Sequence, residues 1–221
     1  MPSSVAVRVL GSGPAVMLVH GAVGPGPTWK AQEVLAARWR LILVTRRGFR
    51  PSPAADRQDF ATDARDLEKL LRREPAHCVG FSYGAVGAAV AAGLAPELFH
   101  SLTLIEPPLT RGAFEALDTP AGGESEGGAP AALEAALRPP WEAEPDVAAI
   151  ARACVPTLVL SGDHSPEPEE VCDALAGRLG AQRDRLPGAG HAVQRTPEFN
   201  GRLERFLFAA ESGVRTRSPG G

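Results

Sequence analysis

Cysteine is scarce in this sequence, and its three residues are far apart. Cys78, Cys154 and Cys172 form no C-x-x-C pair and stand at no Cys/His spacing typical of metal ligation. An odd number of distant cysteines argues against a disulfide framework and against a cysteine-based zinc site. We therefore expect a protein of the reducing cytoplasm.

An excess of one charge and long apolar runs are also missing. Lys and Arg total 23, Asp and Glu total 26, and the formal net charge of -3 is spread along 221 residues. No basic face for nucleic acid stands out. No window reaches the roughly 18 to 20 apolar residues of a membrane span, and the N-terminus lacks a basic start before an apolar run. We expect a soluble, unprocessed protein that binds neither nucleic acid nor membranes.

What the sequence does contain is a regular alternation of short β-branched runs and amphipathic helical patterns, over a length that suits one domain. This alternation is typical of a mostly parallel sheet with helices on both faces, so the predicted fold class is α/β. Helical stripes fall at 59–73 and 199–208, and Thr196 before Pro197 predicts the start of the last helix. The predicted strands cover residues 5–10, 15–19, 40–45, 77–81, 101–106, 157–162 and 182–186.

Residues 107–155 interrupt the alternation. Proline, glycine and glutamate cluster there around two short Ala/Leu segments. Long segments of this kind inside a compact domain are usually functional or disordered. We expect a small lid that carries Trp141 over the site, with a disordered loop as the alternative. The core is then formed by residues 1–106 and 156–211, and residues 212–221 form an unstructured tail.

Ser82 is the central residue of the pentapeptide GFSYG at 80–84. A G-x-S-x-G match alone is weak, but this one follows a predicted strand and precedes a stretch of Ala, Gly and Val. A buried strand that turns directly into a helix needs small residues on both sides of the turn. The turning residue then projects its hydroxyl above the sheet edge. Ser82 is therefore the candidate nucleophile.

A serine hydroxyl is a poor nucleophile at neutral pH and needs a neighbouring base. His191, in LPGAGHAVQ, follows the last predicted strand on a glycine-rich loop at the same sheet edge as Ser82. The alternative is an ordinary loop histidine, but the pairing with the G-x-S-x-G turn favours a general base. We interpret His77, His100 and His164 as structural or solvent-facing.

The stretch MLVHGAVGPGPTW, residues 17–29, runs from a predicted strand into a flexible turn. The backbone N–H groups of Ala22 and Tyr83 are predicted to bind the oxyanion that forms when a serine attacks a carbonyl. His20 is expected to anchor this loop. Neither this stretch nor GSGPAV at 11–16 fits the G-x-G-x-x-G fingerprint or the GK[ST] ending of a P-loop. Nucleotide binding is therefore not expected.

With strand–HG–loop, strand–GFSYG–helix and strand–GxGH–helix in this order, the sequence resembles the α/β-hydrolase fold family, in its serine hydrolase branch. The segment VTRRGFRPSP is similar to one that often reads D-x-R-G-x-G-x-S there, with Thr45 in place of the acid and Arg50 in place of the second glycine. The resemblance covers nearly the whole chain. It implies a catalytic triad and no cofactor. A serine at position 82 argues against the dehalogenase and epoxide hydrolase branches, which use an aspartate.

The resemblance leaves the acid of the triad open. In the family the acid usually stands three residues past the glycine that ends the strand after the lid. That glycine is Gly162, and Ser165 occupies the expected position. Two carboxylates can substitute: Asp163, and Glu106 at the end of the preceding strand, where some family members carry their acid. We favour Glu106, because a glutamate that ends a buried strand needs a partner and could orient the imidazole.

Together these residues predict a carboxylesterase-like or thioesterase-like serine hydrolase. It would cleave a small ester, thioester or related carbonyl substrate through an acyl-enzyme on Ser82, with His191 as base. A cofactor-free lyase or a carbon–carbon bond hydrolase could use the same groups. An acyltransferase or editing thioesterase for carrier-bound substrates is another alternative, and so is a non-catalytic binding protein. The pocket is expected between the lid and the loop that holds Trp29, without metal or organic cofactor.

Overall fold

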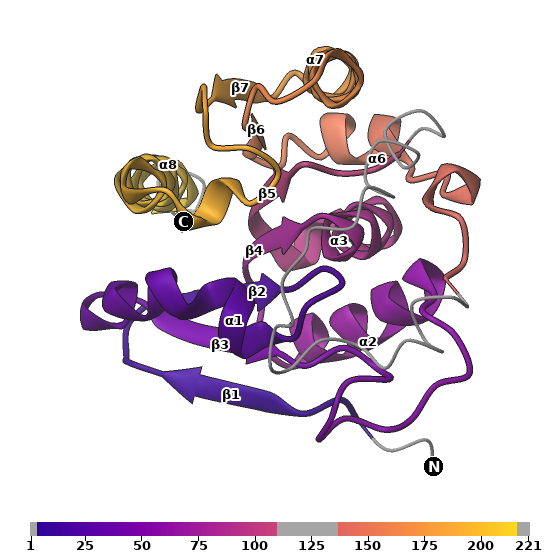
Figure 1. Ribbon diagram of the computed structural model, residues 1–221. Coiled ribbons are helices and arrows are strands. Elements are labelled where there is room, and N and C mark those ends of the chain that lie inside the picture. The colour runs from indigo at the N-terminus through magenta and orange to yellow at the C-terminus, as the bar shows by residue number, and fades with distance from the viewer. Residues whose placement is uncertain (1–3, 110–136, 216–221) are drawn as a thin grey trace.

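The computed structural model describes residues 4–109 and 137–215, which are arranged around one sheet (Figure 1). Within these residues the sheet has seven strands in the order β1-β3-β2-β4-β5-β6-β7. β1 is antiparallel to β3, and the other neighbouring pairs are parallel. The strands are β1 (Val7–Leu10), β2 (Ala15–Val19), β3 (Arg40–Val44), β4 (Ala76–Phe81), β5 (Phe99–Ile105), β6 (Thr157–Ser161) and β7 (Gln182–Arg185). The predicted α/β class is therefore confirmed, and each predicted strand lies on an observed one.

The central strands are apolar along their whole length because both of their faces are covered. In β2, Met17 and Val19 pack into one core cluster, whereas Val16 and Leu18 pack into the other. All four side chains are at most 1% exposed. A strand with two buried faces shows a continuous apolar run instead of an alternating pattern, which is why these strands were readable from the sequence.

Helices cover both faces of the sheet, as predicted. One face packs against α2 (Phe60–Arg73), α3 (Tyr83–Leu94), α6 (Val147–Arg152) and α7 (Pro166–Leu179). The other face packs against α1 (Pro25–Trp29), the 3-10 helix η1 (Lys30–Ala37) and α8 (Pro197–Arg215). Shorter 3-10 helices are η2 (Pro96–Leu98), η4 (Pro140–Glu142) and η5 (Val193–Arg195). Asp59 begins α2, because its carboxylate accepts hydrogen bonds from the first free N–H groups of that helix.

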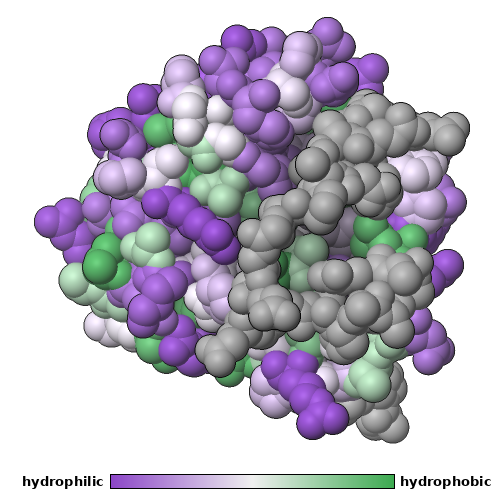
Figure 2. All heavy atoms as spheres, viewed as in Figure 1, coloured by the Kyte–Doolittle hydropathy of each residue, from purple (hydrophilic) through white to green (hydrophobic). Residues whose placement is uncertain are grey.

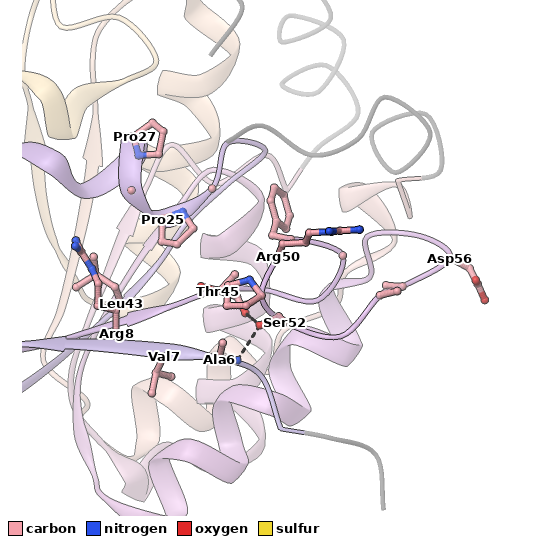
Figure 3. Close-up of a pocket in the computed structure, with 17 residues that line it drawn as sticks. Ala6, Val7, Arg8, Pro25, Pro27, Leu43, Thr45, Arg50, Ser52 and Asp56 are labelled. Atoms are coloured by element: carbon pink, nitrogen blue, oxygen red, sulfur yellow. Dashed lines mark hydrogen bonds between the residues drawn. The ribbon is translucent and has the colours of Figure 1, made fainter. Parts of the chain in front are cut away.

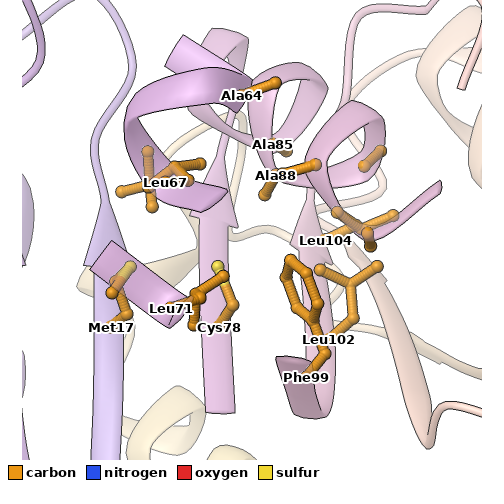
Figure 4. Close-up of a cluster of buried hydrophobic side chains, with 14 of the residues drawn as sticks. Met17, Ala64, Leu67, Leu71, Cys78, Ala85, Ala88, Phe99, Leu102 and Leu104 are labelled. Carbon is orange, nitrogen blue, oxygen red and sulfur yellow. The ribbon is translucent and has the colours of Figure 1, made fainter. Parts of the chain in front are cut away.

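The core beneath α2 and α3 is drawn in Figure 4. Leu67 and Leu71 of α2 lie over the strands near Met17 and Cys78, and each of these side chains is at most 1% exposed. Ala88 of α3 is also fully buried. The small side chains of α3 let this helix lie close to the sheet, so its position relative to the end of β4 is fixed by tight packing.

The face of the molecule in Figure 2 is mixed in character, and its hydrophobic residues form small separate patches among hydrophilic ones. Large exposed apolar side chains, such as Val34 and Phe208, are scattered over different elements. None of the helices described here combines enough length with enough apolar character to cross a bilayer.

The ends of the predicted lid are described, but its middle is not. Residues 110–136 of the 107–155 segment lie outside the described residues. At its C-terminal end, Ile150 of α6 is fully buried in the core cluster shared with α3 and α7. This end of the segment is therefore an integral part of the helical layer.

The C-terminal helix is longer than expected. α8 begins at Pro197, as predicted, but continues to Arg215. The prediction of an unstructured tail was therefore wrong for residues 212–215, and residues 216–221 lie outside the described part of the chain. The amphipathic pattern that marked the helix ends with Ala210, which is buried, so the last turn has no apolar stripe to reveal it.

Candidate active site

Ser82 occupies a sharp turn between β4 and α3. Its backbone has φ 52° and ψ −128°, in the positive-φ region that favours glycine. The Ser82 N–H donates a hydrogen bond of 2.8 Å to the carbonyl oxygen of Ile105 in β5. The turn is therefore held by the neighbouring strand, and the side chain is placed beyond the C-terminal edge of the sheet.

The two glycines of the pentapeptide are required by close backbone approaches. A Cβ on Gly84 would lie 2.3 Å from the carbonyl oxygen of His20, and a Cβ on Gly80 would lie 2.6 Å from the Cα of Ala85. Neither backbone neighbour can move away without shifting a strand or a helix. The sequence pattern G-x-S-x-G is thus explained by the space on either side of Ser82.

His191 lies beside the Ser82 hydroxyl. Its Nε2 is 3.1 Å from Ser82 Oγ, and its ring packs at 5.0 Å from the Phe81 ring. The loop that carries His191 approaches β6 closely, since a Cβ on Gly162 would lie 2.0 Å from the Gly190 carbonyl oxygen. The sequence had placed the serine and the histidine at the same edge, and the structure brings them within hydrogen-bond distance.

Glu106 is the carboxylate behind His191. Its side chain is 1% exposed, and its Oε2 lies 3.6 Å from His191 Nδ1. Its Oε1 accepts a hydrogen bond of 2.6 Å from the Gly162 N–H. His191 Nδ1 is buried and has no hydrogen-bond partner among the described residues. The distance to Oε2 is longer than a hydrogen bond, but Glu106 faces the one ring nitrogen of His191 that needs an acceptor.

Asp163, the other candidate acid, is held through its backbone. It is exposed, and its N–H donates to Glu169 Oε1 at 2.9 Å. No hydrogen bond or ion pair joins its carboxylate to His191 among the residues that the structure describes. Ser165, at the usual position of the family acid, instead precedes the first residue of α7.

His164 is a neighbour of the site that the sequence did not reveal. Its Nδ1 lies 3.6 Å from Glu106 Oε1, and its ring centre lies 6.0 Å from that of His191. It is exposed, as predicted, but it stands at the site. Glu106, His164 and His191 each offer one ligand atom, and these three atoms lie within 4.8 Å of one another, so the three groups could also contact a metal ion. An isolated histidine in a loop gives no periodic signal, and this contact depends on the fold alone.

The loop that holds the predicted oxyanion donors reaches Ser82. A Cβ on Gly21 would lie 2.9 Å from Ser82 Cβ, so the neighbouring Ala22 belongs to a segment in contact with the serine. Tyr83 is the first residue of α3, where the N–H has no acceptor within the helix. Both predicted donors therefore come from backbone next to Ser82, and their binding of an oxyanion stays a prediction.

A buried arginine fastens this loop to the rest of the fold. Arg46 donates to the Gly21 carbonyl oxygen at 2.8 Å and pairs with Asp63 of α2 at 2.9 Å. Its N–H donates to His20 Nε2 at 3.1 Å, and its guanidinium carbon lies 4.9 Å from the centre of the Tyr83 ring. Burial, helped by the Arg46 charge, lowers the pKa of His20 to about 3. Burial raises the pKa of Asp63, although the Arg46 charge opposes this rise. His20 is thus a neutral anchor for the loop, as expected.

Tyr83 ties the far end of the predicted lid to this framework. Its hydroxyl donates to the Arg138 carbonyl oxygen at 2.9 Å and accepts from the Phe60 N–H at 3.2 Å. The guanidinium of Arg138 lies over the Phe60 ring at 4.3 Å. Burial raises the pKa of the Tyr83 hydroxyl, so it remains a neutral donor at physiological pH.

A cavity of about 860 Å³ lies next to the loop that follows β2, on the side of β1 and β3 (Figure 3). Gly24, Pro25, Phe49 and Arg50 are among its lining residues, whereas Ser82 is not. The loop that holds Trp29 does line this cavity, through Gly24, Pro25, Gly26 and Pro27, but the Trp29 side chain itself does not. Trp29 is fully buried in the core on the α8 side of the sheet, because the chain turns into α1 directly after the loop.

The family-model comparison agrees with this geometry. The model described as alpha/beta hydrolase fold matches residues 14–123, which include the loop after β2 and the turn at Ser82. The chain belongs to the α/β-hydrolase fold family. The strand order with an antiparallel first strand and the strand–serine–helix turn are the features of this family that position the site.

Relatives of this α/β-hydrolase fold protein are named as esterases and hydrolases. It is 34% identical over 105 residues to the pimeloyl-[acyl-carrier protein] methyl ester esterase of Aeromonas salmonicida, covering 46% of this chain and 41% of the relative. It is 31% identical over 119 residues to the 2-(acetamidomethylene)succinate hydrolase of Mesorhizobium japonicum, covering 51% and 43%. The chain thus spans less than half of the length of these curated relatives.

Solved structures match over nearly the whole chain. The crystal structure of NosK from Streptomyces actuosus superposes with a TM-score of 0.73 at 29% identity, covering 90% of this chain and 100% of that one. This structural match therefore extends beyond the half of the chain that the curated relatives cover.

Proposed function

We propose that this protein is a serine hydrolase that cleaves a small ester or thioester through an acyl-enzyme on Ser82. The observation that carries the proposal is the distance of 3.1 Å between Ser82 Oγ and His191 Nε2, on a turn with positive φ and with the buried Glu106 carboxylate behind the ring. Nucleophile, base and orienting acid thus follow one another in the order that acyl transfer requires.

In the proposed first step, Ser82 Oγ attacks the substrate carbonyl carbon while its proton passes to His191 Nε2. The imidazolium that forms carries its other proton on Nδ1, which faces Glu106 Oε2. The carboxylate stabilises this charge, and the 3.6 Å distance is expected to shorten as it does so. His191 then gives its proton to the leaving alcohol or thiol, and the acyl group remains on Ser82.

The oxyanion of the tetrahedral intermediate is expected to bind the N–H groups of Ala22 and Tyr83. One such donor is typically worth about 3 kcal/mol in the transition state. Arg46 fixes the first donor loop through Gly21, and the α3 packing fixes the second. Preorganisation of this kind matters because the donors then need no rearrangement while charge develops on the oxygen.

The second step returns the enzyme to its starting state. Water loses a proton to His191 Nε2 and attacks the acyl carbon, and the returning proton releases Ser82 and a carboxylic acid. The proposed reaction uses protein side chains, the two backbone N–H groups and water. A small carbonyl compound is the expected substrate, and an ester is supported by a relative that is named as a methyl ester esterase. A reducing cytoplasm remains the expected compartment, since none of the three cysteines is paired in the structure.

Labelling with a fluorophosphonate tests this function, because the reagent phosphonylates an activated serine. The wild-type protein is expected to react at Ser82, and Ser82→Ala is expected to remove the labelling. Glu106→Gln should slow the reaction far more than Asp163→Asn, which is the matched control because Asp163 is exposed and, unlike Glu106, forms no ion pair with His191 among the described residues. Equal labelling rates in all four proteins would contradict the proposal. A lyase that only transfers protons would, in addition, turn over substrate without an acyl-enzyme.

A further inference from the structure

A second group of histidines and a glutamate lies at the opposite edge of the sheet. His77 stands at the start of β4, His100 at the start of β5, and Glu211 on α8. One ring nitrogen of each histidine and one carboxylate oxygen of Glu211 lie within 4.8 Å of one another. We call these three residues the His77 cluster. The proposed reaction uses none of them.

An irregularity in the sheet turns two histidine rings toward each other. The pairing of β4 with β5 runs from Ala76 with Phe99 to His77 with Ser101, so His100 is an extra residue in β5. The rings of His77 and His100 lie 5.5 Å apart and nearly perpendicular, at 78°. β-Bulges commonly redirect a side chain near a functional site, and this one brings His100 to His77.

The hydrogen bonds around His77 suit a metal ligand. Its Nδ1 lies 2.8 Å from Ser101 Oγ, and its other ring nitrogen, Nε2, lies 3.0 Å from Glu211 Oε1. A ligating histidine usually donates its second N–H to an oxygen acceptor, which fixes the tautomer and the ring orientation. Ser101 is such an acceptor. The separation of Nε2 and the carboxylate oxygen also fits two ligands on one small ion.

His100 also has a buried ring nitrogen without a partner in the part of the chain that the structure describes. His100 Nδ1 is buried and makes no hydrogen bond with the described residues. Buried polar atoms without a partner are uncommon and call for an explanation, such as an ion. Glu211 is partly open to solvent, with 22% of its side chain exposed, so an ion and a water molecule can reach the cluster.

We propose that His77, His100 and Glu211 bind one Zn²⁺ ion. Two imidazoles and one carboxylate are a common three-ligand zinc set, with water at the fourth tetrahedral position. Zn²⁺ at His77 Nε2 takes the place of a ring proton there, and that proton then sits on Nδ1 toward Ser101. The ion would fasten α8 to the starts of β4 and β5, so its expected effect is on stability.

The His77 cluster lies far from the proposed active site, so zinc binding and catalysis can be tested separately. His77 lies near the start of β4 and Ser82 follows its last residue. Strands rise about 3.3 Å per residue, so the two residues are about 17 Å apart. The cluster of Glu106, His164 and His191 offers a rival set of ligand atoms. A test of the zinc site must therefore distinguish the two ends of the sheet.

Zinc titration of the metal-free full chain by calorimetry provides this test. The wild-type protein is expected to bind one Zn²⁺ through the His77 cluster. Glu211→Gln and His100→Gln should weaken binding at least about tenfold. His164→Gln, the matched control at the other end of the sheet, should leave it unchanged. Thermal unfolding gives a second readout. Zn²⁺ should raise the Tm of the wild type and of His164→Gln but not that of Glu211→Gln, and Mg²⁺ should have no such effect.

Two outcomes would overturn the zinc site. One is a wild-type protein that binds no Zn²⁺. The other is binding that His164→Gln abolishes and Glu211→Gln leaves intact. The unfolding transition of each variant in EDTA shows whether the variant is folded, and Glu211→Gln, whose side chain is partly exposed, keeps the test valid if His100→Gln does not fold.

Discussion

Serine, histidine and glutamate meet at both ends of β4 and β5. At the N-terminal edge, Ser101 Oγ lies 2.8 Å from His77 Nδ1, and His77 Nε2 lies 3.0 Å from Glu211. At the C-terminal edge, Ser82 Oγ lies 3.1 Å from His191 Nε2. The chain of contacts at the N-terminal edge is the tighter one, but the proposed reaction takes place at the other edge.

The difference between the two serines is in their backbone and their access. Ser101 is fully buried within a strand and faces no open space for a substrate. Ser82 is 8% exposed and stands on a turn with φ 52°, beyond the end of β4 and next to the Tyr83 N–H, which has no acceptor within α3. A hydrogen-bonded histidine therefore does not by itself make a serine a nucleophile. The turn must also expose the hydroxyl and place amide donors around the carbonyl.

The two glutamates differ in the same sense. Glu106 is 1% exposed and is held by the Gly162 N–H at 2.6 Å, so it can keep one orientation toward His191. Glu211 extends from a helix and is 22% exposed. A fixed carboxylate suits the orientation of an imidazole, whereas an accessible one suits an exchangeable ion.

The sharpest way to break this comparison is to remove each serine in turn. Ser82→Ala is expected to lower kcat for an activated ester about 10⁴-fold or more, because the nucleophile is lost. Ser101→Ala removes the serine with the shorter histidine contact and should leave kcat within about twofold. Steady-state kinetics with a chromogenic ester measure both. A large loss of kcat in Ser101→Ala would contradict the placement of the reaction at the C-terminal edge of the sheet.

The two glutamates allow the next test. Glu106→Gln is expected to lower kcat about 10² to 10⁴-fold, because the amide cannot stabilise the imidazolium and can hold the wrong tautomer. Glu211→Gln makes the same change at the other end and should not alter kcat. The KM of both variants should stay near that of the wild type, since neither side chain is expected to touch the substrate. Similar kcat values for the two variants would remove Glu106 from the mechanism.

The Arg46–Asp63 pair tests whether Arg46 fixes the loop after β2, which carries the predicted oxyanion donor Ala22. Asp63→Asn leaves the buried Arg46 without its anion, and breaking such a pair typically costs about 3–5 kcal/mol of the free energy of unfolding. A loosened donor loop should also lower kcat about tenfold to hundredfold. Glu68→Gln breaks an exposed pair with Arg72 on the same helix and should cost less than about 1 kcal/mol.

Denaturant unfolding, with kcat measured on the folded fraction, separates the two effects of Asp63→Asn. Stability and kcat should fall together in this variant and stay near the wild type in Glu68→Gln. An Asp63→Asn variant that keeps the wild-type kcat would show that Arg46 has no influence on the donor loop.

His20 gives the smallest effect, and it concerns stability. Its pKa is about 3 in the folded chain and near 6.5 when unfolded, so the unfolded state binds the additional proton. The stabilising contribution of neutral His20 is fully present above pH 6.5 and is lost as the pH falls toward 3. The slope attributable to this group is about 1.4 kcal/mol per pH unit. Denaturant unfolding at pH 7 and pH 5 should show a shallower pH dependence in His20→Gln than in the wild type, and equal slopes would contradict the buried neutral histidine.

Much of the fold was predictable because the burial of a strand by distant segments is visible in the strand's own residues. β2 and β6 are apolar throughout since both faces are buried, and a run of that kind is visible without knowledge of neighbours. The turn at Ser82 was equally readable, because Gly80 and Gly84 are required by backbone contacts within the local strand–turn–helix unit and the adjacent strand.

The remaining features depend on contacts between distant segments. Arg46 was overlooked because nothing local shows that an arginine will be 2% exposed and paired with Asp63. His164 reaches Glu106 only when β5 and β6 lie side by side. The bulge at His100 appears only in the pairing of two strands. Glu106 could be favoured over Asp163 from its strand, but the contact of its carboxylate with His191 required the structure.

The most direct test of the central claim is to trap the acyl-enzyme and locate it. A chromogenic acetate ester mixed with the protein and quenched with acid within the first turnover should leave one acetyl group per chain, on the peptide that contains Ser82. Mass spectrometry of the digested protein gives its position. Acetylation of the peptide that contains Ser101, or turnover of the ester with no acetylated serine, would contradict the account.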